Sequence, residues 1–256
     1  MPRPRVLVLG GVDPSGGAGI TADARVLEQH GCHPLAVATC LTVQNRFAFT
    51  AVQSVEPRLL LASLRAAIED GPLHAVKFGL FGEPQALVGV AEVLADQGWP
   101  VVIDPVLSAT AGGYAATDAM VQAYRVVAPR LRAVVSPNRP ELQRLAPHGG
   151  AEELLALGCA AVVAKDGHGI DGEVADRVLT PAGMTVIKHP RANCGVVHGT
   201  GCAFAAALAA GLAHRRDVTA AAMVATLWVG ACLMAMGPAT TGAPRPFEPR
   251  PDRPSM

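Results

Sequence analysis

The stretch GGVDPSGGAGITAD, residues 10–23, decides how the chain begins to fold. It follows a short apolar run at residues 6–9 and precedes a helical pattern over residues 20–30. We therefore expect a strand, a glycine-rich turn and a helix, an arrangement that lets a ligand approach the backbone closely. Asp13 and Asp23 are the candidate polar contacts of such a ligand.

This turn does not match the two common nucleotide-binding turns. A phosphate-binding loop needs Lys and then Ser or Thr after its second glycine, whereas Gly16 is followed by Gly17 and Ala18. A dinucleotide-binding turn needs an acidic residue about 20 positions later, and residues 35–39 contain none. The glycines are better explained as shaping a pocket for a small organic molecule.

Apolar runs and helical patterns alternate along the rest of the chain. Strands are expected at residues 6–9, 35–39, 75–78, 101–103, 133–136 and 160–164, with helices at residues 20–30, 57–69, 84–97 and 117–128. Strands this apolar are typical of a sheet covered on both faces. The pattern predicts an α/β fold with a mostly parallel central sheet and helices on both faces.

The C-terminal half departs from this alternation. Two short runs around residues 180–183 predict an antiparallel hairpin, and two helices, at residues 201–214 and 218–236, are expected to close the domain. We expect residues 1–236 to form a single domain. Residues 237–256 are proline-rich and are expected to form an extended tail that buries little surface.

Composition argues against several classes of protein. The 256 residues are 50% hydrophobic and 4% aromatic with zero formal net charge, which disfavours a nucleic-acid surface. The six cysteines show neither zinc nor disulfide spacing, so a reducing cytoplasm is the expected location. Residues 220–236 are uncharged, but their many alanines favour a buried helix over a membrane span.

The clearest chemical pattern is HGTGC, residues 198–202, at the start of the long helix expected from residue 201. Backbone amides at a helix start bind anions. Cys202 lies in the first turn, where the same field is expected to favour its thiolate. Cys202 could then accept a proton from a substrate hydroxyl while the amides of residues 199–202 stabilise a transferring phosphoryl group. A small buried cysteine beside a simple turn is the structural alternative.

Three charged residues follow or end other expected strands: Asp104, Glu141 and Lys165. The carboxyl ends of parallel strands border the ligand crevice of an open α/β sheet. Two carboxylates and a lysine meeting there are the groups that magnesium–nucleotide chemistry needs. Taken singly, either acid could be a helix cap and Lys165 a surface cation. Together they favour phosphoryl transfer.

Seven segments, in this order and approximate spacing, resemble the hydroxymethylpyrimidine and phosphomethylpyrimidine kinases of thiamine biosynthesis, members of the ribokinase-like superfamily. The resemblance covers about residues 6–236 and rests on GGVDPSGGAGITAD, VQN, VKFG, IDPV, SPNRPE, AKDGH and HGTGC. It implies a three-layer α/β/α fold, often dimeric. It also implies an enzyme that uses ATP with Mg²⁺ to phosphorylate the hydroxymethyl group of 4-amino-5-hydroxymethyl-2-methylpyrimidine and then the monophosphate.

The resemblance also assigns roles to residues. Cys202 matches the family's catalytic cysteine, Lys165 its phosphate-side lysine, and the amides of Gly199, Thr200 and Gly201 its anion hole. Asp104 and Glu141 match acids near the metal and phosphates, the metal being held through water. Gly11, Asp23 and Gln44 match the pyrimidine pocket. The amide of Gln44 can donate to and accept from an aminopyrimidine edge, although a loop-stabilising role is its structural alternative.

Several positions depart from the family pattern. Asp166 stands where a glycine is usual, which sets a carboxylate beside Lys165, and the segment between Glu141 and Lys165 is short. Further departures are Leu80, Leu107, Val197 and Ala203. Two alternatives remain open: a pyridoxal or pyridoxine kinase, whose relatives often carry aspartate after Gly-Thr-Gly, and a non-catalytic pyrimidine-binding protein that kept the pocket.

Overall fold

The computed structural model describes residues 2–109, 112–166 and 173–249. These residues form a nine-stranded sheet in the order β3-β2-β1-β4-β5-β6-β7-β8-β9. All neighbours from β2 to β7 are parallel, whereas β3, β8 and β9 each pair antiparallel with their inner neighbour. The bounds are Arg5–Val12 (β1), His33–Gln44 (β2), Phe49–Ser54 (β3), Ala75–Phe78 (β4), Val101–Ile103 (β5), Val134–Val135 (β6), Ala161–Ala164 (β7), Glu173–Thr180 (β8) and Gly183–Pro190 (β9).

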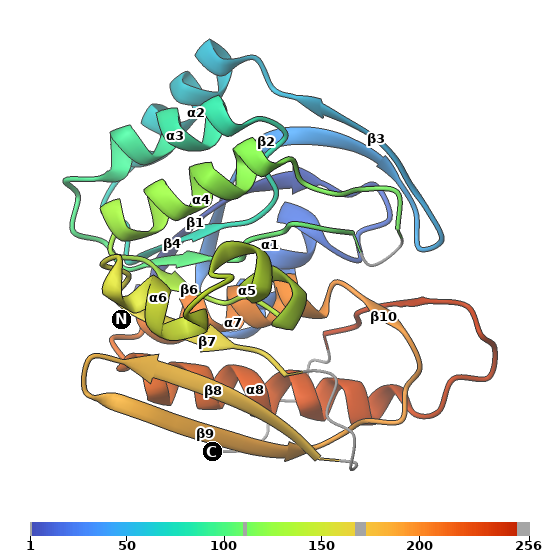
Figure 1. The fold of residues 1–256 in the computed structure, drawn as a ribbon. Coiled ribbons are helices and arrows are strands. Elements are labelled where there is room, and N and C mark those ends of the chain that lie inside the picture. Colours follow the sequence, from blue (N-terminus) through green and yellow to red (C-terminus); the bar gives the residue numbers. More distant parts are fainter. Residues whose placement is uncertain (1, 110–111, 167–172, 250–256) are drawn as a thin grey trace.

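Helices cover both faces of this sheet (Figure 1). Their bounds are Gly19–Gln29 (α1), Pro57–Glu69 (α2), Pro84–Leu94 (α3), Asp118–Arg130 (α4), Arg139–Leu145 (α5), Gly150–Ala156 (α6), Thr200–Ala213 (α7) and Val218–Met236 (α8). Figure 1 shows α2, α3 and α4 together on one side, with α7 and α8 on the other. The predicted three-layer, ribokinase-like α/β/α architecture is therefore confirmed.

Alternate residues of β1 explain why two layers of helices are needed. Val6 and Val8 belong to one buried cluster, with α1, α7 and α8. Leu7 and Leu9 belong to a second cluster, with α2, α3 and α4. Successive side chains of a strand point to opposite faces, so a strand that is apolar at every position buries both faces. This is the pattern that predicted the parallel sheet.

The sequence prediction missed several elements. The predicted hairpin is present as β8 and β9, but each strand runs for eight residues rather than being short. β3 was not expected, and neither were the short helices α5 and α6. A second, two-stranded sheet joins Val197–His198 (β10) to Arg245–Pro246 (β11) in parallel. This pairing brings part of the proline-rich segment against the start of α7.

The helix α8 has the length and apolar composition of a membrane span, and no other helix among the described residues does. It packs closely on α7, because a Cβ added at Gly211 would lie 2.7 Å from the Cβ of Ala221. Trp228 and Val229 are buried in the cluster that covers β1. We conclude that α8 is a core helix, as its alanine content predicted.

The proline-rich segment contributes a buried side chain. Phe247 is only 2% exposed and its ring centroid lies 5.7 Å from that of Trp228 on α8. Its amide donates to the carbonyl of His198 at 2.8 Å. The expectation that this segment buries little surface is therefore wrong at Phe247, because its aromatic ring packs into the core beside Trp228.

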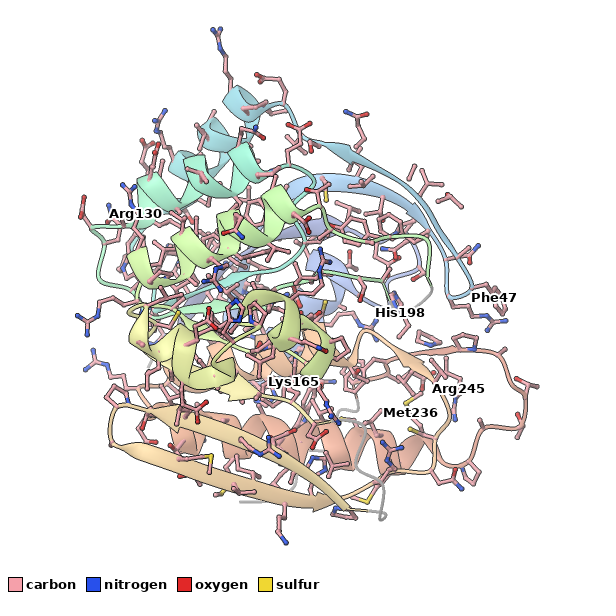
Figure 2. All side chains as sticks on the ribbon, viewed as in Figure 1. Phe47, Arg130, Lys165, His198, Met236 and Arg245 are labelled. Carbon is pink, nitrogen blue, oxygen red and sulfur yellow. The ribbon has the colours of Figure 1, made fainter. Side chains whose placement is uncertain are left out.

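We predict that Phe247→Ala lowers the free energy of unfolding by roughly 3–5 kcal/mol, because it leaves a cavity beside Trp228. Phe47→Ala is the matched control. Phe47 is 55% exposed at the tip of the β2–β3 turn (Figure 2), and its loss should change stability by less than about 0.5 kcal/mol. Urea unfolding of both variants measures the difference. Equal, small effects would show that residue 247 contributes nothing to the core.

Candidate active site

A cavity of about 520 Å³ lies at the carboxyl ends of the parallel strands and reaches the starts of α1 and α7. The ten residues to which the family resemblance assigned a role all line it: Gly11, Asp23, Gln44, Asp104, Glu141, Lys165, Gly199, Thr200, Gly201 and Cys202. The strand order explains this convergence, because parallel strands end at the same edge of the sheet. The cavity is the candidate active site.

The start of α7 forms one wall. Gly199 is its N-cap, with a φ of 92°, and a Cβ there would lie 1.8 Å from the carbonyl oxygen of Gly17. Only glycine fits both this conformation and this contact. The first intrahelical bond runs from the Ala203 amide to the Gly199 carbonyl at 2.9 Å. The preceding amides therefore have no acceptor within the helix and are available to an anion.

Cys202 is partly exposed and lies in the first turn of α7. Burial of the sulfur raises the pKa of its thiol to about 12. Lys77 lowers this pKa, while Asp104 and Asp23 raise it further. The expectation that the helix field favours the thiolate is therefore wrong for this arrangement. Cys202 carries its proton at neutral pH, because desolvation and two nearby carboxylates outweigh the field of one helix end.

Lys165 directly follows β7, and its ammonium lies 3.2 Å from Asp104 Oδ1. Its side chain is 14% exposed and that of Asp104 is 5% exposed (Figure 2 labels Lys165). Burial lowers the pKa of Lys165, but the carboxylates of Asp104 and Glu141 outweigh this and the pKa lies above its usual value. A Cβ at Gly201 would lie 3.6 Å from the ammonium. A fixed positive charge thus adjoins the start of α7.

Glu141 lies at the third position of α5 and completes a capping box. Its carboxylate accepts from the Asn138 amide at 2.8 Å, and the Asn138 side chain accepts from the Glu141 amide at 2.9 Å. The structural alternative considered for this residue, a helix cap, is therefore present, and Glu141 lines the cavity as well. Burial raises its pKa from 4.5 to about 7, with Lys165 opposing and Asp104 adding to the shift.

Lys77 is a site residue that sequence reasoning missed, although VKFG was noted as a motif. It lies on β4, its side chain is 0% exposed, and its ammonium lies 2.7 Å from Asp23 Oδ2. Burial lowers its pKa, but Asp23, Cys202 and Asp104 raise the pKa well above its usual value. A lone lysine inside a strand buried on both faces was the available signal, since such a charge needs a partner.

Asp23 keeps one unused oxygen beside this ion pair. Burial raises its pKa to about 6, with Lys77 lowering it and Asp104 raising it. Oδ2 binds Lys77, whereas Oδ1 is buried and has no hydrogen-bond partner among the described residues. A buried acceptor of this kind is costly unless a donor reaches it. Asp23 therefore offers a hydrogen-bond acceptor to a molecule in the cavity.

Asp13 does not line the cavity, so its interpretation as a ligand contact is wrong. Its carboxylate is used within the protein. Oδ1 accepts from the Ser15 amide at 2.8 Å, and Oδ2 accepts from the Ala18 amide at 3.0 Å and lies 2.9 Å from His198 Nε2. Burial pushes the pKa of Asp13 upward, but hydrogen bonds from His198 and Ser15 outweigh it and hold this pKa below its usual value.

The sequence matches a known family over most of this region. Residues 13–243 match the family described as phosphomethylpyrimidine kinase. The chain belongs to the phosphomethylpyrimidine kinase family. It is 34% identical to the hydroxymethylpyrimidine/phosphomethylpyrimidine kinase of Salmonella typhimurium over 244 residues, which covers 91% of this chain and 92% of that protein. The Escherichia coli enzyme of the same name is 35% identical over 221 residues, covering 82% of this chain and 83% of that protein.

Solved structures of two kinases share the fold. The pyridoxal kinase of Staphylococcus aureus in complex with AMP-PCP aligns with a TM-score of 0.85 at 22% identity, over 96% of this chain and 93% of that one. The phosphomethylpyrimidine kinase of Clostridium difficile aligns with a TM-score of 0.77 at 26% identity, over 89% and 98% of the two chains. The ribokinase-like fold is thus common to kinases of two different heterocycles.

The departures from the phosphomethylpyrimidine kinase pattern occupy different places. Leu80 lines the cavity, whereas Leu107 and Asp166 do not. The Asp166 amide donates to Asp176 Oδ1 at 3.1 Å. Gly167 and His168 of the AKDGH motif lie outside the described residues. Asp166 therefore follows Lys165 in sequence without its side chain joining the cavity wall.

We predict that Glu141→Gln becomes more stable relative to the unchanged protein as pH rises from about 5 to 8. The folded-state pKa of Glu141, about 7, lies above its ordinary value of 4.5, so the folded protein binds this proton more tightly. Its contribution to stability is present below pH 4.5 and is lost as pH rises through 7. Glutamine mimics the protonated carboxyl and keeps the capping box.

The free energy of unfolding of Glu141→Gln, relative to that of the unchanged protein, is expected to increase by roughly 1–3 kcal/mol between about pH 5 and pH 8. Urea unfolding of both proteins at each pH measures it. Asp23 titrates in both proteins, so its effect cancels in the comparison. A difference that stays constant with pH would mean that Glu141 titrates at an ordinary pKa.

Proposed function

We propose that this protein is an ATP-dependent kinase. We propose that it phosphorylates the hydroxymethyl group of 4-amino-5-hydroxymethyl-2-methylpyrimidine and then the monophosphate, in thiamine biosynthesis. The observation that carries the proposal is the single cavity shared by the acceptor groups Asp23 and Gln44 and the anion-binding start of α7. The names of the curated relatives, which span nearly the whole chain, support the same substrate class.

The aminopyrimidine is proposed to bind at the Asp23 and Gln44 end of the cavity. Its ring carries an exocyclic amine, which donates hydrogen bonds, next to ring nitrogens, which accept them. Asp23 Oδ1 is a buried acceptor without a donor among the described residues, and the Gln44 amide both donates and accepts. Gly11 lines this end of the cavity, and a larger residue would crowd it, since a Cβ there would lie 3.0 Å from Cys40 Sγ.

The triphosphate is proposed to bind between Lys165 and the start of α7. The amides of residues 200–202 would hold the transferring phosphoryl group, and the ammonium of Lys165 would balance its charge. Asp104 and Glu141 fit a hydrated Mg²⁺ ion, which binds through one or two carboxylates together with phosphate oxygens. When bound, that ion would neutralise charge on the phosphates. With both acids ionised, the two carboxylates and the ammonium of Lys165 carry net negative charge, which a Mg²⁺ ion would offset.

Cys202 is proposed to contact the substrate hydroxyl. Because the thiol is protonated at neutral pH, we propose that it orients the hydroxyl by hydrogen bonding rather than acting as a standing thiolate. Phosphoryl transfer through a loose transition state requires mainly that the protein position the reactants and stabilise the charge on the phosphoryl group. The hydroxyl can then lose its proton late, to an oxygen of the transferring phosphoryl group, after the bond from that group to ADP has begun to break and the new P–O bond has begun to form.

A pyridoxal kinase is the second candidate, because the pyridoxal kinase fold is so similar. Pyridoxal offers a hydroxymethyl group but no exocyclic amine for Asp23 Oδ1. A non-catalytic pyrimidine-binding protein is the third.

The proposal further includes a homodimer and a cytoplasmic location. The exposed Leu41, Val43 and Phe47 along β2 and its turn offer a surface for a second copy, and the six cysteines are all free.

We predict turnover of the hydroxymethylpyrimidine and its monophosphate, with kcat/KM for pyridoxal at least about 100-fold lower, because pyridoxal lacks the exocyclic amine that is proposed to donate to Asp23. A coupled assay of ADP release with each heterocycle measures these values. Preference for pyridoxal would select the second candidate. Tight pyrimidine binding without ADP release would select the third.

We predict that Cys202→Ala lowers kcat by about 10²- to 10³-fold with KM nearly unchanged, whereas Cys202→Ser keeps kcat within about tenfold of the unchanged protein. A serine hydroxyl preserves hydrogen bonding to the substrate but is a far weaker acid. Steady-state kinetics of both variants separate the two roles. If serine were as damaging as alanine, Cys202 would act as a thiolate base, and an unaffected alanine variant would remove it from the mechanism.

A further inference from the structure

One carboxylate oxygen joins the starts of two helices. Asp13 Oδ2 accepts a hydrogen bond from the amide of Ala18, the N-cap of α1, at 3.0 Å. The same oxygen lies 2.9 Å from Nε2 of His198, which directly precedes Gly199, the N-cap of α7. Neither N-cap residue has a side chain that caps its own helix. Asp13 therefore links the N-cap residue of α1 to the side chain that directly precedes the N-cap of α7.

The surroundings leave this contact little room to move. Asp13 is 2% exposed and His198 is 6% exposed. A Cβ at Gly17 would lie 3.0 Å from Cδ2 of His198, and one at Gly199 would meet the Gly17 carbonyl. On the other side, the backbone of His198 pairs with β11. Figure 2 shows His198 between the ribbon of the N-terminal half and the segment that carries Arg245.

The two helix starts meet at the sulfur of Cys202. The amide of Gly19, the first residue of α1, lowers the pKa of the Cys202 thiol in the first turn of α7, so the two helix starts act on one another. This influence depends on how the start of α1 is held against the start of α7, and the contact of Asp13 with His198 spans the two.

We propose that Asp13 and His198 form a positioning pair that holds the amides of α7 and Cys202 against the start of α1. Its consequence for turnover rests on the kinase function proposed above, but its consequence for the Cys202 environment does not. His198 borders the cavity beside Gly199, whereas Asp13 does not line it, and the pair is proposed to act through the position of the helix starts. It acts by fixing, before any ligand binds, the relative position of two groups of backbone donors.

The test measures the environment of Cys202 without using kinase activity. The variants are His198→Leu, Asp13→Asn and His198→Gln, and iodoacetamide is the probe at one fixed pH. Mass spectrometry of the peptide that contains residue 202 gives the alkylation rate. Leucine removes the donor and asparagine removes the shared anionic acceptor, whereas glutamine retains an N–H donor. Asp217→Ala is the stability control, since it removes the cap of α8, a 2.9 Å bond to the Ala220 amide.

We expect alkylation of Cys202 to be at least about tenfold faster in His198→Leu and Asp13→Asn, because separating the helix starts relieves the burial that disfavours the thiolate. His198→Gln and Asp217→Ala should stay within about twofold of the unchanged protein. Rates in His198→Leu and Asp13→Asn that are unchanged or slower would overturn the proposal. So would an equal acceleration in Asp217→Ala at matched loss of stability.

Kinetics of the same variants then test the consequence for turnover. In His198→Leu we expect kcat to fall by about tenfold or more, with a smaller change in the KM of the pyrimidine and recovery in His198→Gln. If alkylation is faster in the variants but the unchanged protein turns over no pyrimidine, the positioning pair is supported and the kinase function is contradicted. If the unchanged protein is an active kinase but alkylation is no faster in the variants, the kinase function is supported and the positioning pair is contradicted. If His198→Leu does not fold, Asp13→Asn carries the same comparison.

Discussion

The structure depends on compensating two lysines at the carboxyl edge of the sheet, Lys77 fully buried and Lys165 largely buried. Lys77 pairs with Asp23 at 2.7 Å and Lys165 with Asp104 at 3.2 Å. An uncompensated charge at either position would cost several kcal/mol, so each lysine fixes where its carboxylate must lie. The first pair ties α1 to β4, and the second ties β7 to the residue after β5. The cavity between them is therefore lined by charges held in place before any ligand arrives, which is the condition for electrostatic catalysis.

Sequence periodicity accounted for the layers of the fold but not for its edges. Strands such as β1 and β4 were recognisable because every position is apolar, which a central parallel strand requires. β3 has a single buried residue, Phe49, and lies at the edge of the sheet, so it lacks that pattern. The helix α5 is short, and its capping box at Asn138 was a local signal that went unused. Phe247 gives no periodic signal, because its burial depends on Trp228 across the fold.

The residues of the candidate site also fall into those that the sequence could place and those that it could not. Residues at strand ends and at the start of α7 could be placed from sequence, because strand order alone brings them to one edge. The contact between Asp13 and His198 joins residues 185 positions apart, and no local pattern encodes it. The protonation of Cys202 was wrongly predicted for a related reason. The helix end is visible in the sequence, whereas the burial and the carboxylates that raise its pKa come from other elements of the fold.

Substrate choice in this fold has to come from individual side chains. Kinases named for a pyrimidine and for pyridoxal share the same architecture, and in the proposed function the hydroxymethyl group of the substrate would meet the start of α7. The groups that act on phosphate therefore cannot tell them apart. In the proposed function, discrimination falls to the far end of the cavity, where Asp23 Oδ1 has no donor among the described residues because Lys77 occupies only Oδ2. A site built to accept a hydrogen bond rejects a ligand that cannot donate one more strongly than a site built on shape alone. The ion pair at the sheet edge thus also leaves one carboxylate oxygen that, in the proposed function, would accept a hydrogen bond from the exocyclic amine.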